Sequence, residues 1–326
     1  MEEEKIVCKV REKNTYGIKT LTLNNDLLSV QIFAGKGGDI RQITYLPLDM
    51  TVLWENKEML PCYADKDLHR ERLSFYSELN TGSWQDVVPG YGIYGDVELK
   101  ERPVGIAATL PWDYEVLRVG AESVSIRLEV DLPVFPLHIS KIVTLKKGDA
   151  RLYIDETITN NGDKITAATW TQHSAFGGNF LDETVKIHYP ADKIFIPSAF
   201  SKNGGREEDY IMPIDQVTMP DGAVYDLRTM REHKNDGNLV FTQKLERDYF
   251  EMYSERKKAG LRMNWDKEIY PYLRCWYQNT DNGYSIALEP CNYYCHTFDE
   301  CVANKMFLFL EPGESKKSEV IFEIYQ

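Results

Sequence analysis

The sequence lacks a long hydrophobic run, because no apolar stretch of its 326 residues approaches the roughly 18 residues of a membrane-spanning helix. Its first residues, MEEEK, lack the basic start and apolar core of a secretory signal. Six cysteines in a chain of this length are too few for a disulfide scaffold. We therefore expect a cytoplasmic protein with reduced thiols.

The chain is also poor in basic residues relative to acidic ones. It has 38 Lys and Arg against 51 Asp and Glu, for a net charge of −13. Nucleic acids and anionic membranes would be repelled by such a charge, so we expect neither as a partner. The sequence leaves a homo-oligomer open.

Three nucleotide and nucleophile signatures are missing or incomplete. The Gly35–Gly38 segment lacks the GK[ST] ending of a phosphate-binding loop, and Ser174 is not part of a GxSxG nucleophile elbow. Gly90–Gly95 matches GxGxxG, but Asp96–Leu99 then reads as a strand, whereas a dinucleotide site needs a helix there. These features argue against a nucleotide-dependent enzyme and a serine hydrolase.

A cluster of cysteines near the C-terminus lacks metal-ligand spacing. Cys291 and Cys295 are separated by three residues, His296 follows at once, and Cys301 has no CxxC-type partner. We interpret these cysteines as buried or half-buried free thiols.

Strand patterns dominate what the sequence does contain. Alternation of apolar and polar residues with period two is clear in Leu28–Ile32, Val124–Val130 and Val320–Ile324, and less regular in Leu152–Ile158. Gly, Asn and Pro turns separate these segments, and helix patterns are few; Asp65–Leu79 is the best candidate for a short helix. The pattern predicts an all-β protein, a large antiparallel β-sandwich forming one domain over residues 1–326.

Two segments far apart in the sequence place acid–base groups at strand ends. His173 lies in TWTQHSAFGGNF, between a strand-like run and a Gly-Gly turn. Glu289 lies in IALEPCN, at the end of an apolar strand and before a proline. One imidazole and one carboxylate on rigid strand ends can form a catalytic acid–base pair.

In wording, these segments resemble the aldose 1-epimerase (galactose mutarotase-like) family. The order His-Ser-x-Phe at His173 is similar to the central motif of that family, and Leu310–Glu314 resembles the turn before its last strands. The resemblance implies the galactose mutarotase type of sandwich, with a catalytic acid at His173 and a catalytic base at Glu289. It also implies proton transfer alone, with no metal or organic cofactor.

Another segment resembles a bacterial subgroup of that family. Thr81–Pro89, TGSWQDVVP, is similar to the subgroup's Gly-Gly-Trp-Gln-Glu-x-x-Pro, which implies substrate contacts from Trp84 and Gln85. Core packing remains the alternative for Trp84. The relatives then usually have His-Gly-Glu, with the histidine near the ring oxygen of the sugar, where this chain has Tyr94-Gly95-Asp96. A phenol donates a hydrogen bond but does not become a cation near pH 7.

Two further candidates share one strand. Arg274 and Trp276 alternate with Tyr272, so the three point to one face. If that face is concave, Arg274 and Trp276 would bind a sugar; if it is convex, they are surface residues.

The leading expectation is an enzyme that interconverts the anomers of a free hexose or related sugar. A carbohydrate-binding protein with little or no turnover, favoured by Tyr94, is the alternative. A lyase acting on a polysaccharide is a third reading.

Overall fold

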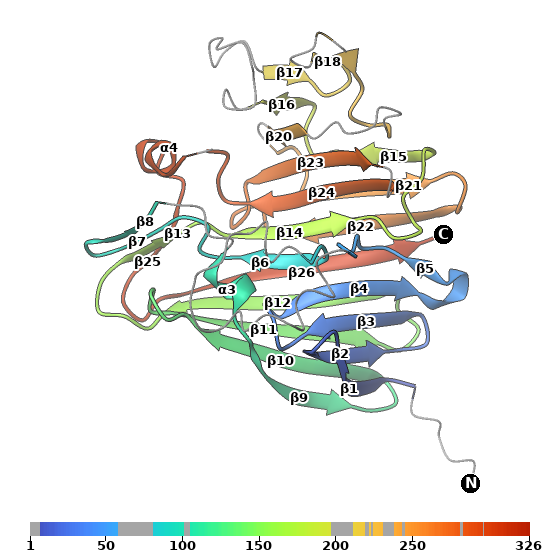
Figure 1. Ribbon diagram of the computed structural model, residues 1–326, viewed down its shortest axis with the longest axis horizontal. Coiled ribbons are helices and arrows are strands. Elements are labelled where there is room, and N and C mark those ends of the chain that lie inside the picture. Colours follow the sequence, from blue (N-terminus) through green and yellow to red (C-terminus); the bar gives the residue numbers. More distant parts are fainter. Residues whose placement is uncertain are drawn as a thin grey trace.

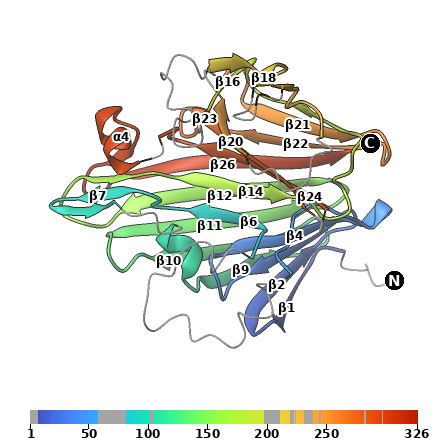
Figure 2. The same ribbon diagram turned by 45° about the horizontal axis from the view of Figure 1, so that its top comes forward.

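The computed structural model describes residues 7–57, 81–100, 105–196, 211–218, 222, 224–230, 238–242, 245–295 without 281 and 282, and 297–326. Two large antiparallel sheets lie one over the other (Figures 1 and 2). This confirms the expected all-β class and the antiparallel sandwich. The expected helix at Asp65–Leu79 falls outside the described residues.

The first large sheet has twelve strands and contains both segments singled out in the sequence. In spatial order its strands are β1 (Lys9–Thr15), β2 (Ile18–Asn24), β3 (Leu28–Phe33), β4 (Asp39–Tyr45), β6 (Trp84–Val87), β14 (Thr171–Phe176), β24 (Gly283–Cys291), β23 (Tyr272–Thr280), β20 (Asn238–Thr242), β16 (Lys193–Phe195) and β17 (Ile211–Pro213), with β5 (Met50–Thr51) beside β4.

The second large sheet has eight strands and includes the last strand of the chain. Its order is β15 (Val185–His188), β21 (Tyr249–Ser254), β22 (Ala259–Trp265), β26 (Ser315–Tyr325), β12 (Arg151–Asn160), β11 (Leu137–Lys146), β10 (Ser123–Asp131) and β9 (Asp113–Val119). Burial alternates along β10 and β11, as expected for strands with one face against the core.

Small elements complete the described part of the chain. They are a four-stranded sheet of β25 (Leu308–Leu310), β13 (Thr166–Ala168), β7 (Gly92–Tyr94) and β8 (Val97–Leu99), a pair of β18 (Val217–Thr218) and β19 (Val224–Tyr225), and the short helices η1 (Leu46–Leu48), α3 (Ile106–Thr109) and α4 (Phe298–Ala303). The Gly90–Gly95 segment leads into the β7–β8 hairpin, which confirms that it does not open a dinucleotide-binding helix. None of the described helices is long and apolar enough to span a bilayer.

Aromatic rings fill the space between the two large sheets. Phe322 of β26 contacts Trp84 of β6 edge-on at 6.0 Å and stacks on Phe176 of β14 at 6.1 Å, both between ring centroids. Such contacts add to the burial of apolar area that holds the layers together.

A group of buried polar side chains, the interlayer network, also joins the two sheets. Lys141 and Glu156 are register partners on β11 and β12, and Asp86 and Gln172 are register partners on β6 and β14. Lys141 forms an ion pair with Asp86, and its Nζ lies 3.9 Å from Glu156 Oε1. Gln172 Nε2 donates to Asp86 Oδ1 at 2.9 Å and to Glu156 Oε2 at 2.6 Å.

Burial shifts the pKa values of the ionisable groups in the network. Burial acts to lower the pKa of Lys141, but Asp86 and Glu156 outweigh it, so that pKa is raised and the ammonium is retained. Burial and the nearby Asp86 raise the pKa of Glu156 well above its usual range, against the opposing effect of Lys141. One buried cation therefore serves two acidic side chains.

Removing the Lys141 charge should destabilise the fold strongly. We expect Lys141→Met to lower the free energy of unfolding by about 3–5 kcal/mol, since Asp86 would remain buried without its partner. Urea denaturation measures this, with Lys147→Met as the control, because Lys147 pairs with Glu122 at the surface. A surface change of this kind should stay within about 0.5 kcal/mol. Equal effects of the two substitutions would contradict a structural role for the network.

Candidate active site

The side chains on the other face of the first sheet form a row across neighbouring strands. Gln85 of β6 is the register partner of His173 of β14, and Glu289 of β24 is the register partner of Arg274 of β23. Side chains alternate along a strand, so the residues next to Asp86 and Gln172, which face the interior, point the opposite way. We call Gln85, His173, Glu289 and Arg274 the site row.

The centre of the row is a close contact between the two predicted catalytic residues. His173 Nε2 lies 3.6 Å from Glu289 Oε1, and Arg274 Nε lies 3.1 Å from Glu289 Oε2. Glu289 is fully buried, and neither of its carboxylate oxygens accepts a hydrogen bond within the described residues. A buried carboxylate in this state is costly unless a ligand completes its contacts.

Neighbouring positive charge stabilises the buried Glu289 carboxylate when no ligand is bound. The Arg274 guanidinium offsets the Glu289 charge, and Arg274 Nη1 also donates to the Tyr293 hydroxyl at 3.4 Å. Burial lowers the pKa of His173 below its usual range; Glu289 opposes this, while Arg274 and Lys36 act in the same direction as burial. His173 is therefore neutral near pH 7 in the absence of a ligand.

The structure brings four of the seven predicted site residues into the row and places a fifth beside it. Trp276 lies two residues along β23 from Arg274, opposite Ala287, so it shares the face of Arg274 as predicted. It packs against an aromatic cluster that includes Phe241 and Tyr293. The face carrying Arg274 and Trp276 is thus the one that also carries His173 and Glu289.

Trp84 and Tyr94 lie elsewhere. Trp84 points into the interior, where its ring packs on Phe322 and its Nε1 donates to Gln172 Oε1 at 2.8 Å. This position corrects the expected sugar contact in favour of core packing. Tyr94 lies in the small sheet, and its hydroxyl donates to Asp163 Oδ1 at 2.8 Å, so it does not take the expected place near a ring oxygen.

Two charged residues that the sequence analysis did not assign lie beside the row. Lys36, in the turn between β3 and β4, forms an ion pair with Asp39, the first residue of β4, and Gln85 Nε2 donates to Asp39 Oδ2 at 3.1 Å. The available signal was the unusual composition of Gly35-Lys36-Gly37-Gly38-Asp39, in which ionisable residues alternate with glycines that permit close approach.

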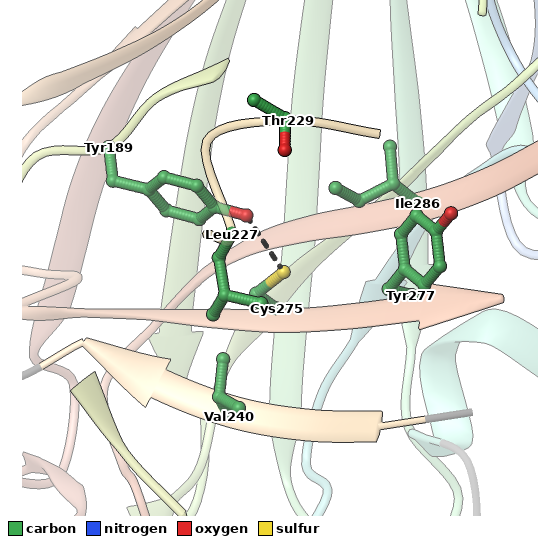
Figure 3. A pocket seen from close by; sticks show the side chains of 7 residues that line it. All are labelled: Tyr189, Leu227, Thr229, Val240, Cys275, Tyr277 and Ile286. Carbon is green, nitrogen blue, oxygen red and sulfur yellow. Dashed lines mark hydrogen bonds between the residues drawn. The ribbon is translucent and has the colours of Figure 1, made fainter. Parts of the chain in front are cut away.

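Two cavities lie away from the row. The smaller, about 10 Å³, is lined by Cys275 and Tyr277 on the inner face of β23, with Tyr189 against Cys275 (Figure 3). It has room for about one water molecule. The larger, about 800 Å³, is lined in part by Glu55, Gln278 and Ser285, further along the strands of the row.

The cysteines near the site are structural. Within the described residues no group of His, Cys, Asp and Glu has the arrangement of a metal site. Cys291, Cys295 and Cys301 are buried thiols outside any disulfide, which confirms that part of the prediction. Burial raises the pKa of Cys291 to about 12. A thiol of this kind is a poor nucleophile near pH 7.

The row lies on one face of a large antiparallel β-sandwich and contains a buried histidine–glutamate pair. The chain belongs to the family described as Domain of unknown function (DUF4432), whose pattern matches residues 128–324, more than half of the sequence. No curated protein matches the chain.

Solved structures are similar in fold but distant in sequence. A "putative aldose 1-epimerase" from Klebsiella pneumoniae has a TM-score of 0.72 at 18% identity, covering 94% of this chain and 79% of that one. A galactose mutarotase-like protein from Clostridium acetobutylicum has a TM-score of 0.67 at 14% identity, covering 98% and 99%. Another from Lactobacillus casei has a TM-score of 0.63 at 14% identity, covering 94% and 100%. These likenesses show the galactose mutarotase-like fold.

The lowered pKa of His173 gives the folding stability a defined pH dependence. The unfolded chain takes up the His173 proton near pH 6.5, whereas the folded protein takes it up only at lower pH. The stabilising contribution is thus fully present above pH 6.5 and is lost as the pH falls through the folded-state pKa. We expect wild type to lose stability relative to His173→Gln between pH 7 and 5, as measured by urea denaturation. A constant difference over that range would contradict a neutral, buried imidazole.

Proposed function

We propose that this protein interconverts the α and β anomers of a free hexose or a related neutral aldose by acid–base ring opening. The observation that carries the proposal is the buried Glu289 carboxylate, whose oxygens accept no hydrogen bond in the described part of the chain, 3.6 Å from His173 Nε2. The distant likeness to proteins named for aldose epimerisation supports the same chemistry.

The spacing of the pair suits the two oxygens involved. The anomeric hydroxyl and the ring oxygen of a pyranose are bonded to the same carbon, so adjacent protein groups reach both. Glu289 removes the proton of the anomeric hydroxyl while His173 protonates the ring oxygen. The ring bond breaks, the aldehyde forms, and rotation about the C1–C2 bond exposes its other face. On closure, His173 recovers its proton and Glu289 returns the other.

The remaining members of the row position and balance these groups. Arg274 holds Glu289 Oε2, which leaves Oε1 on the side of His173. Because the resting His173 is neutral near pH 7, ring opening proceeds from the fraction of molecules in which its imidazole is protonated. The Glu289 charge favours that form, and burial, which lowers the pKa overall, makes the imidazolium a stronger acid. His173 and Glu289 are buried, whereas Arg274 is half-buried, so a sugar would enter on the side of Arg274.

The expected cytoplasmic location forms part of the proposal. Five cysteines lie in the described part of the chain, and all are free thiols. Reduced thiols are typical of a cytoplasmic protein.

Substitution of either member of the pair should reduce turnover selectively. We expect His173→Gln and Glu289→Gln each to lower kcat for anomer exchange by about 10²–10⁴-fold, the usual contribution of a positioned acid or base. Exchange NMR on a panel of neutral aldoses measures the rate. His188→Gln and Glu122→Gln are matched controls at exposed positions and should keep the wild-type rate.

Three outcomes separate the hypotheses. Loss of rate in both site variants, with intact folding by circular dichroism, supports the acid–base pair. Saturation transfer from a sugar to the wild type without faster exchange would instead indicate a binding protein. Full activity in both variants would contradict the proposal.

A further inference from the structure

The turn between β3 and β4 buries a lysine beside the site row. Lys36 and Asp39 are both fully buried, which is rare for charged residues unless they are paired. Gly37 and Gly38 have φ values of 69° and 59°, in the left-handed region that glycine adopts at little cost. Lys141 of the interlayer network donates to the Gly38 carbonyl at 2.9 Å, which fixes the turn from below.

Two side-chain oxygens next to this turn, on Asp39 of β4 and Gln85 of β6, have no hydrogen-bond donor among the described residues. Asp39 Oδ2 receives both Lys36 Nζ and Gln85 Nε2, whereas Asp39 Oδ1 and Gln85 Oε1 accept no hydrogen bond within the described residues. Lys36 Nζ, with three donor hydrogens, has Asp39 as its hydrogen-bond acceptor. A Cβ at position 37 would come within 2.1 Å of Asp39 Oδ1, so only glycine leaves this buried oxygen in its present position.

These atoms lie next to the acid–base pair, because Gln85 is the register partner of His173. From the combination of buried acceptors, spare lysine donors and this adjacency, we infer that Lys36, Asp39 and Gln85 form a hydroxyl-binding subsite for a neutral sugar. The inference rests on the proposed function and adds the residues that select the substrate. A sugar hydroxyl donates one hydrogen bond and accepts others, so it matches an acceptor oxygen beside an ammonium.

The charge balance of the site favours neutral ligands over anionic ones. Lys36 is paired with Asp39, Arg274 is paired with Glu289, and Lys141 beneath them is paired with Asp86. A phosphate or carboxylate would need a cation free to compensate it in this buried environment, and each of these cations already has an acidic partner. A neutral polyol needs only hydrogen bonds.

The experiment compares sugars that differ by one hydroxyl. The value of kcat/KM for anomer exchange is measured by NMR for the best neutral aldose, its monodeoxy analogues and its 6-phosphate. We expect wild type to lose about 10-fold or more with at least one deoxy analogue, the usual effect of losing a hydrogen bond to a charged group. The 6-phosphate should be turned over less efficiently than the neutral parent.

Two variants then test whether the hydroxyl that is missing from the poorer analogue binds Lys36, Asp39 and Gln85. Gln85→Met removes the amide without changing the charge, and the double variant Lys36→Met/Asp39→Leu removes both charges together, which avoids leaving one unpaired. With the parent sugar each should lose about 10-fold, and with the analogue lacking the bound hydroxyl each should match wild type. Gln278→Met, further along the same face, is the control and should match wild type with every sugar.

The outcomes distinguish this inference from the proposed function. If wild type exchanges an aldose but treats all deoxy analogues like the parent, the subsite is contradicted and the acid–base pair stands; this arm needs no variant. A uniform loss in the variants across all sugars, or preference for the 6-phosphate, also overturns the subsite. If wild type accelerates exchange of no aldose, the proposed function fails and the subsite fails with it.

Discussion

The ion pair of Lys141 with Asp86 is buried between the two sheets. It constrains the register of the strands that carry the site row. Lys141 also lies near Glu156, and Gln172 connects both acidic groups. Because a buried charge that loses its partner is strongly destabilising, the strands must keep the register that pairs these groups. The register of β6 with β14 follows, and with it the order of side chains on the opposite face.

The two members of the interlayer network on the first sheet, Asp86 and Gln172, each have a site residue beside them in the chain. Asp86 precedes Val87 and follows Gln85, and Gln172 precedes His173. A strand that turns one residue inward necessarily turns the next outward, so fixing Asp86 and Gln172 fixes Gln85 and His173. The hydrogen bond from Lys141 to Gly38 extends the same control to the turn that carries Lys36 and leads into Asp39. The site is therefore positioned by strands and a tight turn rather than by long loops.

Much of the fold was predictable because it depends on local pattern. Alternation along Val124–Val130 and Val320–Ile324 gave the strands β10 and β26, and the resemblance at His173 and Glu289 indicated residues that the structure places 3.6 Å apart. The irregular alternation of Leu152–Ile158 also has a physical cause. Glu156 occupies an inward position where an apolar residue is expected, because it faces Lys141 across the register.

Other features depend on tertiary context that the sequence does not display. Alternation shows that Trp84 and Gln85 face opposite sides of β6, but it does not show which side carries the site. The motif comparison at Tyr94 identified a departure from the relatives without showing that its strand belongs to a separate small sheet. A lysine among glycines indicates only an incomplete phosphate-binding loop. It gives no sign that Lys36 will be buried against Asp39, which lies two strands from His173.

The account depends most directly on where a sugar binds. A crystal structure of the wild-type protein with the aldose that it exchanges fastest would show this. We expect the pyranose between Gln85 and Arg274, with its anomeric oxygen within hydrogen-bond distance of Glu289 Oε1 and its ring oxygen within that distance of His173 Nε2. A sugar bound instead in the larger cavity beside Gln278 and Ser285, with no contact to Glu289, would contradict the account.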